Sequence, residues 1–171
     1  MAAWMAVLAA TLLLLVDADP FPASCQLNLM VILDMSDSAR GGLTNTKKFI
    51  LDVSEELVIG EHDHSAALIA YAGKTGRIVK KWNFAKNNDE FKKQITNLQR
   101  IGGLTNTQGA LEDAMKLMKS RNPKNPTVIM LVTDGRSNDD SIGAAAELRK
   151  FPNTYFFVAS MGIGNVNKAQ R

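Results

Sequence analysis

The chain has 171 residues, of which 46% are hydrophobic and 22% charged, with a formal net charge of +3. This length and apolar content predict a single globular domain with a substantial core, because two domains would be crowded. Lys and Arg are dispersed without a dense basic block, which argues against nucleic acid as a partner.

The N-terminal residues 1–18 are expected to be a signal peptide. Met1 to Val16 contain no charged side chain and include four consecutive leucines, and Val16-Asp17-Ala18 is a small-residue cleavage site. The apolar stretch is shorter than the roughly 20 residues that a spanning helix requires, so no stable membrane span is expected after cleavage. We therefore expect a secreted, extracellular protein whose residues 19–25 form an extended N-terminal extension.

In the first half of the domain, the sequence predicts one strand before a helix and two strands after it. An apolar run gives a strand over 27–33, and apolar positions at helical spacing give a helix over 47–59. Two more strands are expected at 66–71 and 77–84, joined by the glycine-containing hairpin 73–76. Since a tight turn allows only antiparallel pairing, this hairpin predicts one antiparallel edge strand on an otherwise parallel sheet.

The second half alternates helices and strands. Helices are expected at 88–98, 108–119 and 141–150, and buried strands at 127–133 and 154–160. This alternation predicts an α/β fold with a doubly wound, mostly parallel sheet and helices on both faces.

Three distant segments carry the same kind of oxygen-rich chemistry. Asp34-Met35-Ser36-Asp37-Ser38 and Thr133-Asp134-Gly135 each follow a buried strand, at the edge where open α/β sheets bind ligands. The third segment is the glycine-rich loop 102–107. Two carboxylates and three hydroxyls from such segments would form an incomplete octahedron around a hard divalent cation, with room for water or a partner's carboxylate.

This arrangement resembles the von Willebrand factor A domain and its metal-ion-dependent adhesion site. The family has Asp-x-Ser-x-Ser after the first strand, a Thr in a glycine-rich central loop and an Asp in a strand-ending Thr-Asp-Gly. Carried over by position, the metal site would consist of Asp34, Ser36, Ser38, Thr105 and Asp134. The resemblance implies a non-enzymatic adhesion module that uses Mg²⁺, or Mn²⁺ in its place, to capture an acidic side chain of collagen, another matrix protein or a cell-surface partner.

The resemblance also carries two departures. Many relatives have Gly where this chain has Asp37, and an additional acid there could tighten metal binding or repel an acidic partner. A complete family member continues into a further helix, strand and helix, so the domain at residues 26–171 is expected to be C-terminally incomplete.

The resemblance also bears on Cys25. Relatives often pair a cysteine at the position of Cys25 with one after the last element, and the alternative is a free or intermolecularly paired thiol.

Two alternatives use the same residues differently. A magnesium-dependent phosphoryl-transfer enzyme of the haloacid dehalogenase type also has an Asp at a strand end, but it needs a second Asp two positions later, where this chain has Ser36. Arg136 alone beside Asp134 is weak evidence for phosphate binding. The other alternative is the same fold with an empty metal site.

The remaining motifs favour ordinary structural roles. The hexapeptide 41–46 repeats the glycine-rich loop 102–107, and its Thr or Asn is expected to be a helix N-cap. His62 and His64 lie in a polar turn without further ligands at a zinc-binding spacing. The acidic segment 138–140 is expected to begin a helix.

Overall fold

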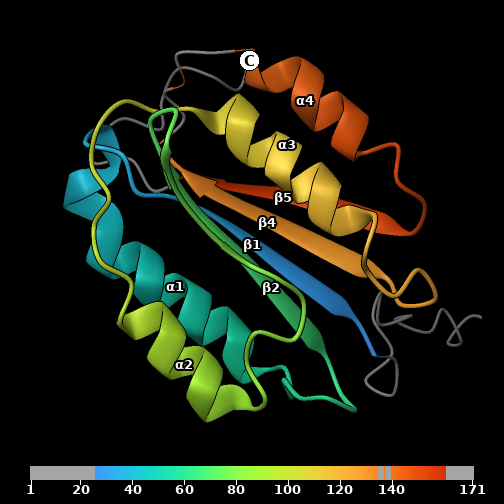
Figure 1. Ribbon diagram of the computed structural model, residues 1–171. Helices are drawn as coiled ribbons and strands as arrows, with labels where there is room; N and C mark the ends of the chain where they lie inside the picture. The colour runs from blue at the N-terminus through green and yellow to red at the C-terminus, as the bar shows by residue number, and fades with distance from the viewer. Residues whose placement is uncertain (1–25, 135–136, 138–139, 161–171) are drawn as a thin grey trace, which may run out of the picture.

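A computed structural model describes residues 26–134, 137 and 140–160. The expected signal peptide, the N-terminal extension with Cys25, Gly135, Arg136 and residues 161–171 lie outside the described residues. Within the described part, a single five-stranded sheet lies between two layers of helices (Figure 1).

The sheet has the strand order β3-β2-β1-β4-β5. The strands are β1 (Asn28–Asp34), β2 (Ser65–Ala72), β3 (Gly76–Lys80), β4 (Thr127–Thr133) and β5 (Thr154–Ser160). β1 pairs in parallel with β2 and β4, and β4 with β5, whereas β3 is antiparallel to β2 and forms one edge. The predicted mostly parallel sheet with one antiparallel edge strand is therefore confirmed.

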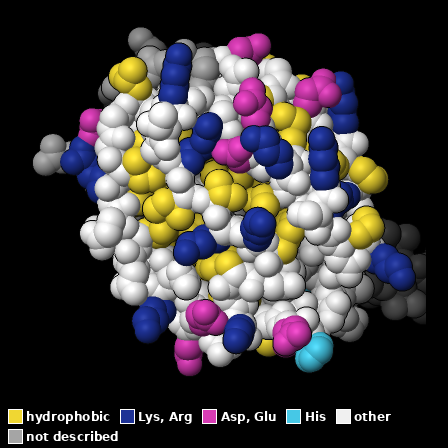
Figure 2. Space-filling model, in the orientation of Figure 1, with side chains coloured by type: hydrophobic (Ala, Val, Ile, Leu, Met, Phe, Trp, Pro, Cys, Tyr) yellow, Lys and Arg dark blue, Asp and Glu magenta, His cyan; other side chains and the backbone are white. Residues whose placement is uncertain are grey.

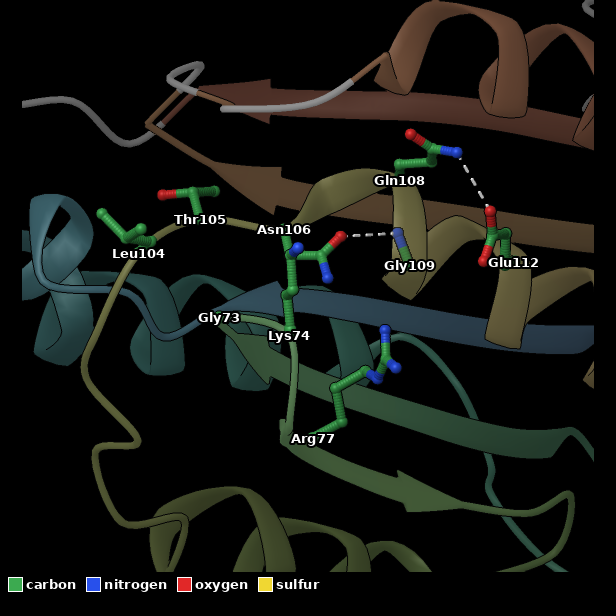
Figure 3. Close-up of a pocket in the computed structure, with 9 residues that line it drawn as sticks. All are labelled: Gly73, Lys74, Arg77, Leu104, Thr105, Asn106, Gln108, Gly109 and Glu112. Carbon is green, nitrogen blue, oxygen red and sulfur yellow. Dashed lines mark hydrogen bonds between the residues drawn. The ribbon is translucent and has the colours of Figure 1, made fainter.

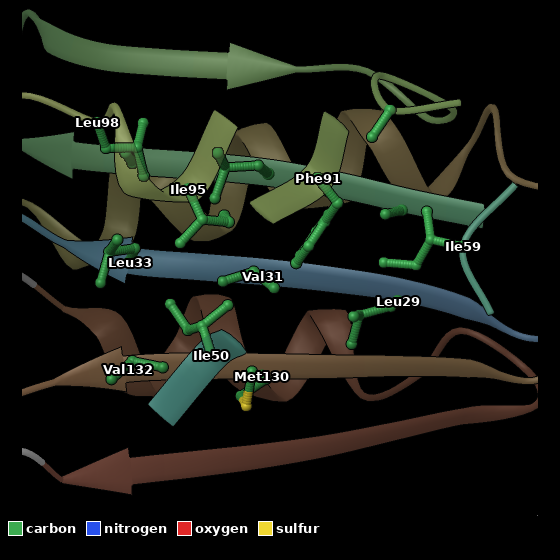
Figure 4. Close-up of a cluster of buried hydrophobic side chains, with 14 of the residues drawn as sticks. Leu29, Val31, Leu33, Ile50, Ile59, Phe91, Ile95, Leu98, Met130 and Val132 are labelled. Atoms are coloured by element: carbon green, nitrogen blue, oxygen red, sulfur yellow. The ribbon is translucent and has the colours of Figure 1, made fainter. Parts of the chain in front are cut away.

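The helices divide between the two faces of the sheet (Figure 1). α1 (Leu43–Glu55) and α2 (Asn88–Thr96) cover one face, and α3 (Thr107–Met118) and α4 (Ser141–Leu148) cover the other. Side chains of β1 alternate between the two resulting cores, as the pleat requires. Val31 packs with Ile50 of α1 and Phe91 of α2 (Figure 4), whereas Ile32 belongs to the cluster that includes Leu111 of α3.

Every residue of β1 is buried. A central strand covered on both faces has no solvent side, which is why its sequence is a continuous apolar run rather than an alternating one. The last residue of this buried strand is Asp34, so the fold places a carboxylate at the edge of the core.

Two elements, β3 and α1, differ clearly from their predicted bounds. β3 ends at Lys80 rather than at residue 84, because Asn83 has a left-handed φ of 59° and Trp82 turns to donate a 2.8 Å hydrogen bond from Nε1 to the carbonyl of Leu117. α1 runs from Leu43 to Glu55 rather than over 47–59. The backbone N–H of Ile59 instead donates to Oδ1 of Asn88, which holds this buried residue outside the helix.

The repeated hexapeptide adopts two conformations. In the second copy, Oδ1 of Asn106 accepts a 2.9 Å hydrogen bond from the N–H of Gly109, so Asn106 caps α3. In the first copy α1 already begins at Leu43, directly after a short 3-10 helix (Ser38–Gly42), and its N-cap is Gly42 without a side-chain cap. The expected capping by Thr or Asn of the first copy is therefore wrong, because the preceding helical turn has already started the helix.

The surface carries charges of both signs. On the face shown in Figure 2, Lys and Arg side chains are distributed with Asp and Glu side chains among them. In the part of the chain that the structure describes, no helix has the length and apolar character needed to cross a membrane.

Candidate metal centre

The candidate centre lies where the chain direction diverges in the sheet. β1 and β4 are neighbours and parallel. After β1 the chain continues into α1 on one face, whereas after β4 it continues into α4 on the other face. The carboxyl ends of two such diverging strands are the usual ligand position in open α/β sheets.

Asp34 is the anchored carboxylate at this edge of the sheet. Its side chain is buried, and Oδ1 accepts a 2.9 Å hydrogen bond from the N–H of Ser36. Oδ2 accepts a 2.8 Å hydrogen bond from the hydroxyl of Thr133, the last residue of β4. One carboxylate oxygen is thereby oriented by the loop after β1 and the other by the end of β4.

Burial raises the pKa of the Asp34 carboxyl above its ordinary value of 3.8. The hydrogen bonds from Ser36 and Thr133 act in the opposite direction, and the nearby negative charge of Asp134 raises the pKa further. Asp134 is half-buried at the end of β4. A cation between the two carboxylates would offset both the burial cost and the repulsion, so this pair is suited to holding one.

Three hydroxyls form a chain beside these carboxylates. Oγ of Ser36 lies 3.0 Å from Oγ of Ser38, which lies 3.4 Å from Oγ1 of Thr105. Adjacent oxygens around an octahedral Mg²⁺ at about 2.1 Å are separated by about 3 Å. The spacing of the hydroxyls therefore fits a shared cation, and the structure brings Ser36, Ser38 and Thr105 together from two loops far apart in sequence.

The central loop is the segment between α2 and α3, and it contacts the first motif, Asp34–Ser38, through left-handed backbone at two glycines. Gly102 and Gly103 have φ values of 76° and 98°, in the left-handed region that favours glycine. The N–H of Gly102 donates a 3.0 Å hydrogen bond to the carbonyl of Met35, so the loop lies directly against the Asp34–Ser38 segment. Thr105 follows this contact and is buried.

Asp37 is directed toward the central loop. Its carboxylate accepts a 2.9 Å hydrogen bond from the N–H of Gly103 and forms an ion pair with Arg100. The carboxylate of Asp37 thus has its own partners in the central loop. Sequence reasoning assigned no role to Arg100 or to Thr133; for Thr133, the available signal was its position between a buried strand and Asp134.

The von Willebrand factor type A domain family model matches residues 28–170. This chain belongs to that family. Human collagen alpha-5(VI) chain is 31% identical over 129 residues, and mouse matrilin-2 is 28% identical over 148 residues. The alignments cover 72% and 82% of this chain but only 5% and 15% of the two relatives, so the chain spans a small fraction of their length.

Solved structures show the same fold. Proximal thread matrix protein 1 from the mussel byssus, with a zinc-occupied MIDAS motif, has a TM-score of 0.68 at 19% identity, covering 78% of this chain and 37% of that one. Manganese-loaded TRAP protein of Plasmodium vivax has a TM-score of 0.66 at 17% identity, covering 81% of this chain and 58% of that one. At these identities the likeness supports the type A domain architecture.

A pocket of about 690 Å³ adjoins the candidate centre of this type A domain (Figure 3). Thr105 belongs both to the chain of hydroxyls and to the pocket lining. The other lining residues come from the β2–β3 turn, β3, the central loop and α3: Gly73, Lys74, Arg77, Leu104, Asn106, Gln108, Gly109 and Glu112. The side chain of Leu104 is 73% exposed at this position, which makes it available to a bound partner.

The other polar motifs have structural partners. Nδ1 of His64 accepts a 3.1 Å hydrogen bond from the N–H of Leu27, and burial lowers the pKa of His64 below 6.5. Oδ1 of Asp140 accepts a hydrogen bond from the N–H of Gly143 and caps α4, as expected for this acidic segment. Among the described residues, no group of three or more His, Cys, Asp or Glu side chains is placed to hold a metal. A metal centre formed by the described residues would need hydroxyl ligands as well.

Proposed function

We propose that this chain is an extracellular protein-binding module that captures an acidic side chain of a matrix partner, such as collagen, through a divalent cation. Mg²⁺ is the proposed ion, with Mn²⁺ as a substitute. The proposed ligands are Asp34, Ser36, Ser38, Thr105 and Asp134, which bind directly or through water.

The chain of hydroxyls beside a buried carboxylate carries this proposal. Separations of 3.0 and 3.4 Å between the hydroxyl oxygens match the edges of an octahedral shell. Two carboxylates balance the charge of a divalent ion without exceeding it. A partner's carboxylate that completes the shell would gain a charge-assisted, directional contact in a crevice.

The relatives support the extracellular and adhesive parts of the proposal. Collagen alpha-5(VI) chain and matrilin-2 share the domain, and two solved neighbours have a zinc-occupied MIDAS motif and bound manganese. Membership in the type A family disfavours phosphoryl transfer, as does Ser36 at the position where such an enzyme needs its second Asp.

A pull-down from extracellular extract tests the proposal. We expect the wild-type chain to retain a partner with Mg²⁺ and to release it with excess chelator. Asp34→Ala and Asp134→Ala should abolish capture while the fold remains, whereas Glu56→Ala, an exposed acid at the end of α1, should have no effect. Equal capture with chelator would reject the mechanism, and absence of cation binding in calorimetry would indicate an empty site. Turnover of generic phosphate esters with Mg²⁺ would indicate the enzymatic alternative.

A further inference from the structure

We propose that Asp37 and Arg100 are positioning residues that hold Thr105 at the cation without ligating it. This inference rests on the proposed function and identifies what aligns the two halves of the site. We call the ion pair of Asp37 and Arg100, together with the hydrogen bonds between Asp37 and Gly103, the loop clasp.

The loop clasp joins the first motif to the central loop by reciprocal contacts. The N–H of Asp37 donates a 2.9 Å hydrogen bond to the carbonyl of Gly103, and the N–H of Gly103 donates a 2.9 Å hydrogen bond to Oδ2 of Asp37. Oδ1 of Asp37 pairs with the guanidinium of Arg100. One side chain therefore binds the central loop at two points, on both sides of Gly102.

The ion pair also limits what residue 102 can be. A Cβ on Gly102 would lie 3.3 Å from Oδ1 of Asp37 and 3.5 Å from a guanidinium nitrogen of Arg100, in addition to the strain of a φ of 76°. A Cβ on Gly103 would meet no atom within 4 Å. The loop clasp thus packs closely against Gly102, whose N–H also donates a hydrogen bond to the carbonyl of Met35.

Thr105 lies two residues beyond the clasp and is held from the opposite side as well. The N–H of Gly73, in the β2–β3 turn, donates a hydrogen bond to the carbonyl of Leu104. The loop carrying Thr105 is thereby held between the β2–β3 turn and the first motif. Without the loop clasp, Gly102 and Gly103 could adopt several backbone conformations, because glycine is the least restricted residue. The position of Thr105 relative to Ser38 would then be poorly defined.

The clasp also determines the charge that an approaching ligand encounters. Arg100 balances the charge of Asp37, so a divalent ion with Asp34 and Asp134 forms a neutral centre. An unpaired Asp37 would make the same region net negative and would oppose an incoming carboxylate. The ion pair with Arg100 therefore allows an acid at residue 37 without repelling an acidic partner.

The sign of one mutational effect separates positioning from simple electrostatics. Removing a positive charge near a bound cation should raise cation affinity if Arg100 acts only through its field. If Arg100 positions Thr105, Arg100→Gln should instead lower the affinity for Mn²⁺, by about two- to fivefold, the upper part of the range for loss of an exposed ion pair. Asp37→Ala should also lower the Mn²⁺ affinity. The double variant should bind Mn²⁺ no less tightly than the weaker-binding single variant, because both substitutions remove the same ion pair.

Calorimetric titration of the full chain with Mn²⁺ measures these affinities. Lys92→Gln is the matched control, because Lys92 is 41% exposed and paired with Glu55 at 3.2 Å, while Arg100 is 43% exposed. It should leave the Mn²⁺ affinity unchanged. Hydrogen exchange of the Gly103 amide provides a readout without metal, and Asp37→Ala should accelerate it in the cation-free chain.

The outcomes distinguish this inference from the proposed function. If the wild type binds Mn²⁺ and Arg100→Gln keeps or raises the affinity, the clasp does not position Thr105 and the inference is overturned. Unchanged exchange at Gly103 in Asp37→Ala would overturn it as well. If the wild type binds no cation, the proposed function fails and this role of the clasp fails with it.

Discussion

The hydroxyl of Thr133 donates a 2.8 Å hydrogen bond to Oδ2 of Asp34, which joins the last residues of two neighbouring strands 99 positions apart in the chain. This contact holds the buried carboxylate at the edge of the sheet and leaves its orientation little freedom. It also stabilises the ionised form of Asp34, against the effect of burial.

We expect Thr133→Val to weaken Mn²⁺ binding several-fold and to destabilise the domain by about 1–2 kcal/mol, because a buried hydrogen bond to a carboxylate is lost. Thr127→Val is the matched control. Thr127 is in the same strand and its Oγ1 accepts a 3.1 Å hydrogen bond from Asn28 at the opposite end of β1. This control should affect unfolding but not calorimetric Mn²⁺ affinity; equal affinity losses would remove the special role of Thr133.

The raised pKa of Asp34 predicts that the ionised carboxylate, which a cation requires, destabilises the cation-free domain. Because the folded-state pKa lies above the unfolded value of 3.8, the contribution of Asp34 to stability is fully present below pH 3.8 and is lost as pH rises through the folded pKa. Asp34→Asn should therefore raise the melting temperature of the cation-free domain at pH 7. Glu56→Gln, in an exposed position, should not.

The same shift should appear in the pH dependence of cation binding. Since the cation requires the carboxylate, Mn²⁺ affinity should decline with falling pH, and the decline should begin at a higher pH than an ordinary Asp would give. Calorimetry in a pH series measures this. An affinity that stays constant down to pH 3.8 would show that Asp34 is not the titrating ligand.

His64 predicts a separate loss of stability in mild acid. Burial lowers its pKa, and Nδ1 must remain unprotonated to accept the hydrogen bond from Leu27. Its contribution is present above pH 6.5 and is lost as pH falls through the folded pKa. Chemical denaturation at pH 7.5 and 5.5 should show a smaller pH effect in His64→Gln than in wild type, whereas the exposed His62→Gln should retain the wild-type effect.

Leu104 should affect the partner but not the ion. Leu104 is 73% exposed beside the 690 Å³ pocket, and its backbone carbonyl accepts a hydrogen bond from Gly73 of the β2–β3 turn. Leu104→Ala should reduce partner affinity by about 1 kcal/mol through lost apolar contact, with Mn²⁺ affinity unchanged. Val58→Ala, 62% exposed near the end of α1, is the control for surface binding measurements; an equal loss there would argue against a specific contact at Leu104.

Much of the sheet could be predicted because its signals are local. β1 and β4 each contain an apolar run of five residues, and the glycines of the β2–β3 turn specify antiparallel pairing within a few positions. The ends of α1 and β3 could not be predicted in the same way. They depend on contacts with remote partners, namely Asn88 for Ile59 and Leu117 for Trp82.

The candidate site also combines contacts between residues close in sequence, which could be predicted, with long-range contacts, which could not. Ser36 and Ser38 are close to Asp34 in sequence, so their meeting requires only a turn after β1. The approach of Thr105 depends on the left-handed path of Gly102 and Gly103, and the family resemblance, rather than the spacing of residues, predicted it. Nothing in the sequence pairs Arg100 with Asp37, because their contact exists only after the central loop has docked.

β1 is buried along its whole length, and the central loop is held by the loop clasp and by the backbone hydrogen bonds of Gly102 and Leu104. Both sides of the proposed centre are thus fixed. A rigid opening discriminates between divalent ions by radius, because selectivity among such ions depends on rigidity and cavity size. With oxygen separations of 3.0 and 3.4 Å, the centre should consequently prefer Mg²⁺ or Mn²⁺ to the larger Ca²⁺.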